Sequence, residues 1–314
     1  MLLKEIVEIY NLLDSSEVTG YDIKSYLSNI SNKNVDINVH TLKVEKGSTD
    51  FVRITIPGTN GKINGGNAPT LGVLGRLGGI GARPEVTGFV SDGDGALAVL
   101  AVAAKILNMN SKGDLLKGDV VISTHICPDA PTIPHNPVPF MDSPVDMATM
   151  NSEEVKGNLD AIISVDTTKG NRIINHNGFA ISPTVKDGFI LKVSEDLLDI
   201  MERTTGKLPK VLPITNQDIT PYGNNIHHIN SIMQPSTATS SPVVGVAITT
   251  ESIVAGCATG ATNPYDVEQA ARYVLEVCKD FGEGKVSFYD ETEWDIIKKR
   301  YGDLKILQTL GNNI

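Results

Sequence analysis

The chain has 314 residues, 40% of them hydrophobic and 20% charged, which is the composition of an ordinary globular protein. Its formal net charge of −10 argues against a nucleic-acid or anionic-membrane partner, because both bind basic surfaces. Three cysteines without a close pair favour neither a disulfide framework nor a Cys-only zinc site. No apolar run reaches the length of about 18 residues that a membrane span needs. The spacing of apolar residues at the start of the chain predicts an amphipathic helix and not a signal peptide, so we expect a cytoplasmic protein.

Apolar periodicity and capping residues predict an alternation of helices and strands. In chain order the expected elements are helices at 2–13 and 20–30, strands at 35–39 and 51–56, a helix at 96–109, strands at 118–124, 161–165, 179–181 and 188–193, a helix at 195–203, a strand at 243–248, a helix at 264–281, a strand at 286–289 and a helix from 290. The alternation predicts one α/β domain over residues 1–314, a three-layer sandwich with a mixed sheet between helices.

Glycine is dense between Pro57 and Pro84. The spacing does not fit the G-x-G-x-x-G loop that cradles phosphates, and Pro84 with Glu85 stands where a helix should begin. We therefore expect tight turns and close backbone packing in this segment.

Two carboxylates stand where a short apolar run meets an alanine-rich helix, in the stretch Phe89-Val-Ser-Asp-Gly-Asp-Gly95. Asp92 and Asp94 are flanked by glycines that allow a sharp turn and a close approach to a ligand. Two interpretations are open for these acids: caps of the following helix, or ligands of a metal ion.

Acids and an imidazole also follow two predicted strands. His125 and Asp129 come after the strand at 118–124, and Asp166 follows the strand at 161–165. The carboxyl ends of strands are where open α/β sheets bind ligands. Carboxylates with imidazole suit zinc, manganese or cobalt, which can activate a bound water. A proline-rich segment, 130–144, which contains His135, is expected to be an irregular loop over this edge.

Other candidates have simpler explanations. Cys127 lies two residues beyond His125, but a nucleophile and its base must meet across a fold, so a buried inert thiol is favoured over a catalytic one. Of the adjacent His227 and His228, one at most could reach a shared site if the segment is helical. His40 falls on the polar side of its strand, and no G-x-S-x-G elbow is present.

The order of these features resembles the deblocking or tetrahedral aminopeptidases, which are co-catalytic zinc exopeptidases. Val18-Thr-Gly-Tyr-Asp22 is similar to their opening turn, and Ser91-Asp-Gly-Asp-Gly-Ala-Leu-Ala98 resembles the acidic turn that holds the bridging metal ligand. The stretch Asp160-Ala-Ile-Ile-Ser-Val-Asp166 resembles a strand that ends in another metal aspartate. The chain departs from this pattern in three places: it has no candidate for the ligand histidine expected some way before Asp92, since His40 is the only histidine upstream, no Glu-Glu pair after residue 124 and no histidine at 249–252.

Longer phrases resemble a bacterial and archaeal family of unknown function, the one numbered 1177. They are Thr124-His-Ile-Cys-Pro-Asp-Ala-Pro131, Asp166-Thr-Thr-Lys-Gly-Asn171 and Gln217-Asp-Ile-Thr-Pro-Tyr-Gly-Asn224, and the likeness extends from Lys4 to Tyr289. This resemblance identifies a family without assigning it an activity.

Together these resemblances imply a fold of the zinc-exopeptidase (phosphorylase/hydrolase-like) type and a metal-dependent hydrolase acting on a small peptide or amide. Asp92 is then a bridging ligand or a ligand of one metal, His125 and Asp166 are further ligands of a divalent metal, zinc first with manganese or cobalt as alternatives, and Asp94 or Asp129 is the general base. The alternative is a metal-free peptidase-like scaffold that binds a small ligand or assembles without catalysis. In either case we expect a small-molecule or peptide partner and a homo-oligomer.

Overall fold

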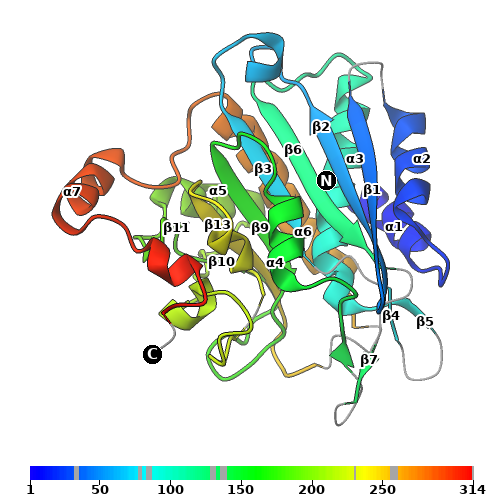
Figure 1. Ribbon diagram of the computed structural model, residues 1–314. Coiled ribbons are helices and arrows are strands. Elements are labelled where there is room, and N and C mark those ends of the chain that lie inside the picture. Colours follow the sequence, from blue (N-terminus) through cyan, green and yellow to red (C-terminus); the bar gives the residue numbers. More distant parts are fainter. Residues whose placement is uncertain are drawn as a thin grey trace.

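A twisted mixed sheet runs through the middle of the computed structural model, which describes residues 1–31, 35–76, 80–82, 87–127, 132–134, 140–229, 231–254 and 261–312 (Figure 1). Within these residues the sheet has nine strands in the order β1-β2-β6-β3-β9-β13-β11-β12, with β10 also pairing with β13. They are β1 (Asp36–Val44), β2 (Gly47–Ile56), β3 (Thr70–Gly75), β6 (Asp119–Ile126), β9 (Ala161–Thr167), β10 (Gly178–Ile181), β11 (Val185–Lys186), β12 (Phe189–Ile190) and β13 (Val243–Thr249). Strands β6, β3, β9 and β13 are parallel, and the outer strands join antiparallel.

Two small hairpins lie outside the main sheet. They pair β4 (Ile80–Ala82) with β5 (Thr87–Phe89), and β7 (Thr132–Ile133) with β8 (Phe140–Met141). Both hairpins lie near the carboxyl ends of the central parallel strands (Figure 1).

Helices cover one face of the sheet and build the larger core. They are α1 (Leu3–Leu13), α2 (Gly20–Ile30), α3 (Asp94–Asn110), α5 (Glu195–Thr205) and α6 (Pro264–Gly282). Helix α3 is apolar nearly all round because it lies between the sheet and the helices α1 and α6, and most of its side chains are buried. The capping residues act as the sequence predicts: Thr19 and Asp22 form a capping box on α2, and Ser194 caps α5.

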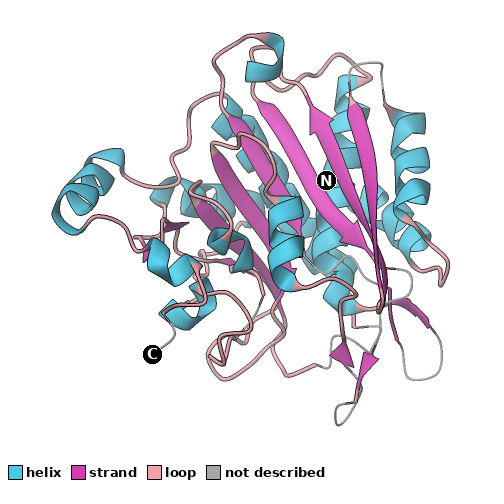
Figure 2. Cartoon of the chain, in the orientation of Figure 1, coloured by secondary structure: helices cyan, strands magenta, loops and turns pink. Residues whose placement is uncertain are grey.

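The opposite face of the sheet carries a thinner layer. It consists of α4 (Met147–Glu154) with the 3-10 helices η3 (Asn216–Ile219) and η4 (Gln234–Thr237), which pack over a second, smaller apolar cluster (Figure 2). The predicted three-layer α/β fold with a mixed sheet is therefore confirmed. The remaining 3-10 helices are η1 (Lys62–Asn64), η2 (Ser91–Gly93) and η5 (Lys305–Gln308).

Helix α7 (Glu291–Tyr301) lies apart from the main helical layer (Figure 1). Its Trp294, the only tryptophan of the chain, is 6% exposed and packs edge-on against Phe189 and Tyr289. The ammonium group of Lys186 lies 5.4 Å from the centre of the Trp294 ring. These contacts fasten α7 to the small hairpin β11–β12 at the edge of the sheet.

Three sequence-based expectations need correction. The glycine-dense segment contains a fully buried strand, β3, besides its turns. Glycines obscure its strand pattern but serve packing, because a Cβ atom on Gly75 would lie 2.5 Å from Cγ2 of Val99 on α3. Residues 286–289 form no strand. The side chains of Val286 and Phe288 both point into the core, which gives the alternating pattern of a strand, but the segment pairs with no neighbouring strand among the described residues. The strand predicted at 188–193 is limited to β12.

None of the helices in the described part of the chain is both long and apolar enough to cross a bilayer.

Candidate functional site

Three polar residues form one row across the carboxyl ends of the central strands. Thr124 of β6, Gly75 of β3 and Val165 of β9 are paired in register. The next residues along the three strands, His125, Arg76 and Asp166, therefore also lie side by side. Successive side chains of a strand point to opposite faces, so these three point away from α3, toward the layer that contains α4.

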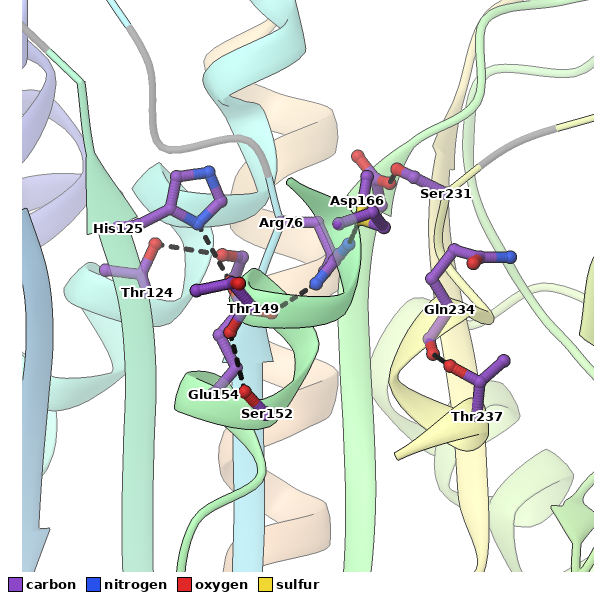
Figure 3. A network of polar contacts seen from close by, with 12 residues as sticks. Arg76, Thr124, His125, Thr149, Ser152, Glu154, Asp166, Ser231, Gln234 and Thr237 are labelled. Atoms are coloured by element: carbon purple, nitrogen blue, oxygen red, sulfur yellow. Dashed lines mark hydrogen bonds and ion pairs between the residues drawn. The ribbon is translucent and has the colours of Figure 1, made fainter. Parts of the chain in front are cut away.

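Arg76 is the centre of a buried ion-pair network (Figure 3). Its guanidinium group forms an ion pair with Glu154 of α4, and both side chains are fully buried. Nδ1 of His125 lies 2.8 Å from the other oxygen of Glu154. Nη2 of Arg76 donates to the sulfur of Met147 at 2.8 Å, while Nε has no hydrogen-bond partner among the described residues. We call Arg76, Glu154, His125 and Asp166 the Arg76 network.

A second group of charges begins at the start of α3. Oδ2 of Asp94 lies 3.3 Å from Nζ of Lys169, and Oδ1 accepts a hydrogen bond from Thr262 at 2.8 Å. Asp92 is partly exposed and neighbours the same lysine. We call Asp92, Asp94 and Lys169 the acidic junction. Neither acid is the N-cap of its helix, since Val90 and Gly93 occupy those positions and no side chain caps either helix.

A hydrogen bond joins the two groups. Oγ1 of Thr167, the residue after Asp166, donates at 2.7 Å to the backbone oxygen of Ser91, the residue before Asp92. The bond holds the end of β9 against the turn that carries Asp92. In addition to burial, which has the larger effect, the negative charge of Asp92 raises the pKa of both Asp94 and Asp166. Asp92, Asp94 and Asp166 thus form one electrostatic unit at the edge of the sheet.

Burial is the main cause of the unusual pKa values at this edge. It raises the pKa of Asp166 to about 7, although Ser231 and Arg76 act in the opposite direction. It raises the pKa of Asp94 to about 6 against the effect of Lys169, and it also raises the pKa of Asp92. Glu154 differs: burial alone would raise its pKa, but Arg76 and His125 outweigh burial and hold the pKa below its ordinary value.

The predicted metal ligands are only partly brought together. Asp92 and Asp166 lie in the same electrostatic unit. His125 on β6 is separated from Asp166 on β9 by β3, the strand that Arg76 follows, and two strand spacings make about 10 Å between β6 and β9. Asp129, the predicted general base, lies outside the described residues, as does His135. The ligand and base assignments stay predictions.

Two of the other candidates, Cys127 and His228, contact neighbouring side chains or backbone. Cys127 is buried beside Thr49, with 3.3 Å between its sulfur and Oγ1, and burial raises the pKa of its thiol to about 12. His227 and His228 do not lie on a helix. His228 packs on the ring of Tyr222, and its Nε2 lies 2.9 Å from the backbone oxygen of Thr220.

A surface groove of about 560 Å³ begins next to the Arg76 network. Met147, which contacts Arg76, and Tyr222, whose pKa rises through burial and the charge of Asp166, are both in its wall. Lys43 and Asp146 add charges of opposite sign. The volume suits a small molecule or a few residues of a peptide.

Arg76 and Glu154 are the site residues that the sequence did not indicate. Arg76 is a lone basic residue among glycines, and Glu154 ends a short helix that was not predicted. Asp146 caps that helix by accepting from the backbone N–H of Thr149 at 2.9 Å, which is the one local signal that could have located it.

Solved structures with a similar fold include several enzymes. The cytosol aminopeptidase of Coxiella burnetii aligns with a TM-score of 0.50 and 12% identity over 89% of this chain and 68% of that one. The bottromycin maturation enzyme BotP aligns with a TM-score of 0.50 and 14% identity over 88% and 70%. Glutaminyl cyclase of an Acidobacteriales bacterium aligns with a TM-score of 0.52 and 12% identity over 90% and 94%. At these identities the likeness shows a shared peptidase-like fold.

No curated protein matches the sequence. The model of one protein family does match, over residues 40–311, which is most of the chain. The predicted family is thereby confirmed, and the chain belongs to the family described as "Protein of unknown function (DUF1177)".

Proposed function

We propose that this protein is a hydrolase that cleaves an amide bond in a small peptide or amide at the carboxyl edge of its sheet. The observation that carries the proposal is the coupling of Asp92, Asp94 and Asp166 where β9 meets the start of α3. Burial raises the pKa of all three carboxyl groups, and the charge of Asp92 adds a smaller effect on the other two, so this edge holds acids suited to take up or release a proton, as amide hydrolysis needs. The fold shared with an aminopeptidase and a glutaminyl cyclase supports this reaction class.

The three acids differ in how far they can take part. Both oxygens of Asp94 are engaged, by Lys169 and Thr262. Asp166 is 1% exposed and accepts hydrogen bonds from Ser231 and from the backbone N–H of Thr167. Asp92 is partly exposed, and no described residue donates a hydrogen bond to it. Asp92 is therefore the acid placed to take a proton from an attacking water, while Asp94 and Asp166 set its charge environment.

A divalent metal was expected from the sequence, and a bound metal would supply an activated water at this edge. The described residues do not fit that expectation well. Among them, no three His, Cys, Asp or Glu side chains lie close enough to hold a metal ion. Two side-chain cations, Lys169 and Arg76, already face Asp94 and Asp166. The roles given to Asp92, Asp94 and Asp166 accordingly involve no metal.

The groove beside Tyr222 and Met147 suggests where the substrate binds. Its volume of about 560 Å³ admits a short peptide or a small amide, and its wall includes Met147, which contacts Arg76. The absence of an excess of basic residues fits a small substrate better than a nucleic acid. A cytoplasmic location and assembly into a homo-oligomer belong to the same proposal.

Turnover of a mixed panel of dipeptides, blocked peptides and simple amides, followed by mass spectrometry, tests the proposal. We expect Asp92→Asn to reduce kcat/KM by at least about 100-fold, the usual contribution of a general base. Asp114→Asn, which changes an exposed acid beyond the far end of α3, is the matched control and should retain full activity. Lack of turnover by the wild type, with and without added zinc, manganese or cobalt, would leave a ligand-binding scaffold as the better description.

A further inference from the structure

Arg76 carries a charged side chain in a fully buried position. Burying a guanidinium group is unfavourable unless ion pairs and hydrogen bonds replace water. Arg76 is fully buried, yet its strong partner is Glu154 alone; its other described contact is the weak sulfur acceptor of Met147, and its Nε is unpartnered among the described residues. Packing alone would be satisfied by an apolar side chain of similar size, so the positive charge itself needs a reason.

The surroundings of Arg76 supply that reason. On one side Glu154 is shared between Arg76 and His125, and on the other Asp166 is influenced by the charge of Arg76 (Figure 3). Without Arg76, two buried carboxyl groups and an imidazole would surround a space with no cation. Carboxylate and imidazole are also the ligands that bind first-row divalent metals. The network thus contains donor types that bind such metals, but no three of the described side chains lie close enough to hold one ion, and an arginine lies at its centre.

The acidic junction repeats the arrangement with a lysine. Nζ of Lys169 lies 3.3 Å from Asp94, and its charge also lowers the pKa of Asp92 against the larger effect of burial. Lys169 is itself largely buried, with 10% of its side chain exposed. The Arg76 network and the acidic junction therefore each contain a positively charged side chain, Arg76 in the first and Lys169 in the second.

We propose that Arg76, assisted by Lys169, takes the place of a divalent metal ion in this site, so that the protein keeps its acidic edge together without bound metal. The inference concerns the centre of the proposed function and rests on it for the site's catalytic role. The site then needs no metal for its integrity, and the side chain of Arg76 supplies positive charge in a chain that departs from the metal-ligand pattern of the aminopeptidases it resembles.

Metal analysis of wild-type protein purified without chelator is the primary test. We expect no stoichiometric zinc, manganese or cobalt, no saturable binding of these ions by titration calorimetry, and the same Tm with and without chelator. One metal ion per chain, or a Tm that falls when chelator is added, would overturn the inference. This measurement requires no variant, so it decides the question even if changes at Arg76 prevent folding.

Two variants test the role of Arg76 directly. Arg76→Ala removes the cation beside Glu154 and His125, and we expect its affinity for Zn²⁺ to rise at least about tenfold over the wild type, a change of 1.4 kcal/mol in binding free energy. Arg76→Lys retains a positive charge and is the matched control, expected to gain no affinity. Equal zinc binding by folded Arg76→Ala and by the wild type would contradict the assignment.

Hydrolysis assays separate this inference from the proposed function. Turnover that persists in chelator supports both. Turnover that requires added metal would retain the hydrolase and reject the role of Arg76. A wild type that binds no metal and hydrolyses nothing in the panel would retain the role of Arg76 and reject the hydrolase.

Discussion

Replacing Asp166 with asparagine should make the protein more stable at neutral and alkaline pH. The ordinary pKa of the carboxyl group is 3.8, and burial raises it to about 7 in the folded protein. Between these values the folded state holds a proton that the unfolded state has released. The free energy of unfolding therefore falls as pH rises through this window, and the stability present below pH 3.8 is lost above about pH 7.

The magnitude follows from the two pKa values. A difference of about 3 corresponds to about 4 kcal/mol at most, because each pKa unit is worth 1.36 kcal/mol. Only part of this loss falls in an accessible range: from about pH 5 to about pH 8 the wild type should lose about 3 kcal/mol through Asp166. The asparagine side chain of the variant does not titrate, and its carbonyl oxygen can still accept one of the hydrogen bonds that Ser231 and Thr167 donate to Asp166.

Urea unfolding followed by circular dichroism, at several pH values and in chelator, gives the free energies. The free energy of unfolding of Asp166→Asn minus that of the wild type should increase steadily from about pH 5 to about pH 8. The same difference for Asp114→Asn should stay near zero. A flat difference for Asp166→Asn would refute the claim that Asp166 titrates abnormally. A difference of the opposite slope would mean that the fold stabilises the ionised carboxylate, as a bound cation would.

Other changes probe the surroundings of the site. Arg76→Met should destabilise the protein by about 3–5 kcal/mol in urea unfolding, because it removes the guanidinium partner of the buried Glu154 and leaves His125 beside it, and the double variant Arg76→Met/Glu154→Gln should recover most of that loss; a double variant as unstable as the single one would contradict the pairing. Gly75→Ala should cost about 1–3 kcal/mol, since the added Cβ lies 2.5 Å from Val99, and thermal unfolding that matches the wild type would contradict that contact. Cys127 should react with iodoacetamide at about pH 8 only after denaturation, because its thiol is buried with a pKa of about 12; rapid labelling of the native protein, read by peptide mass spectrometry, would show the reverse.

The sequence predicted most helices and central strands because their signals are local. Thr19, Ser194 and Asn263 cap helices with their own side chains, and β6 and β13 are continuous apolar runs. β3 escaped prediction because two of its six residues, Gly72 and Gly75, carry no side chain to show a pattern. Whether such a segment pairs as a strand depends on neighbours that are distant in sequence.

The site was predictable at its edge and not at its centre. Asp92 and Asp166 could be located because each follows a recognisable apolar run. Arg76 and Glu154 could not, since their importance arises from a buried contact between residues 78 positions apart. The same holds for His125. The sequence predicted its position at the carboxyl end of its strand, but not its contact with the carboxylate of Glu154.

Trp294 gives the chain a built-in reporter of one particular region. Because it is the sole tryptophan and lies in the contact between α7 and the β11–β12 hairpin, its fluorescence spectrum should respond to detachment of α7. Circular dichroism instead follows all helices and strands at once. Coincident unfolding curves from the two signals would mean that α7 and the sheet unfold as one cooperative unit, whereas an earlier fluorescence transition would mean that α7 is released first.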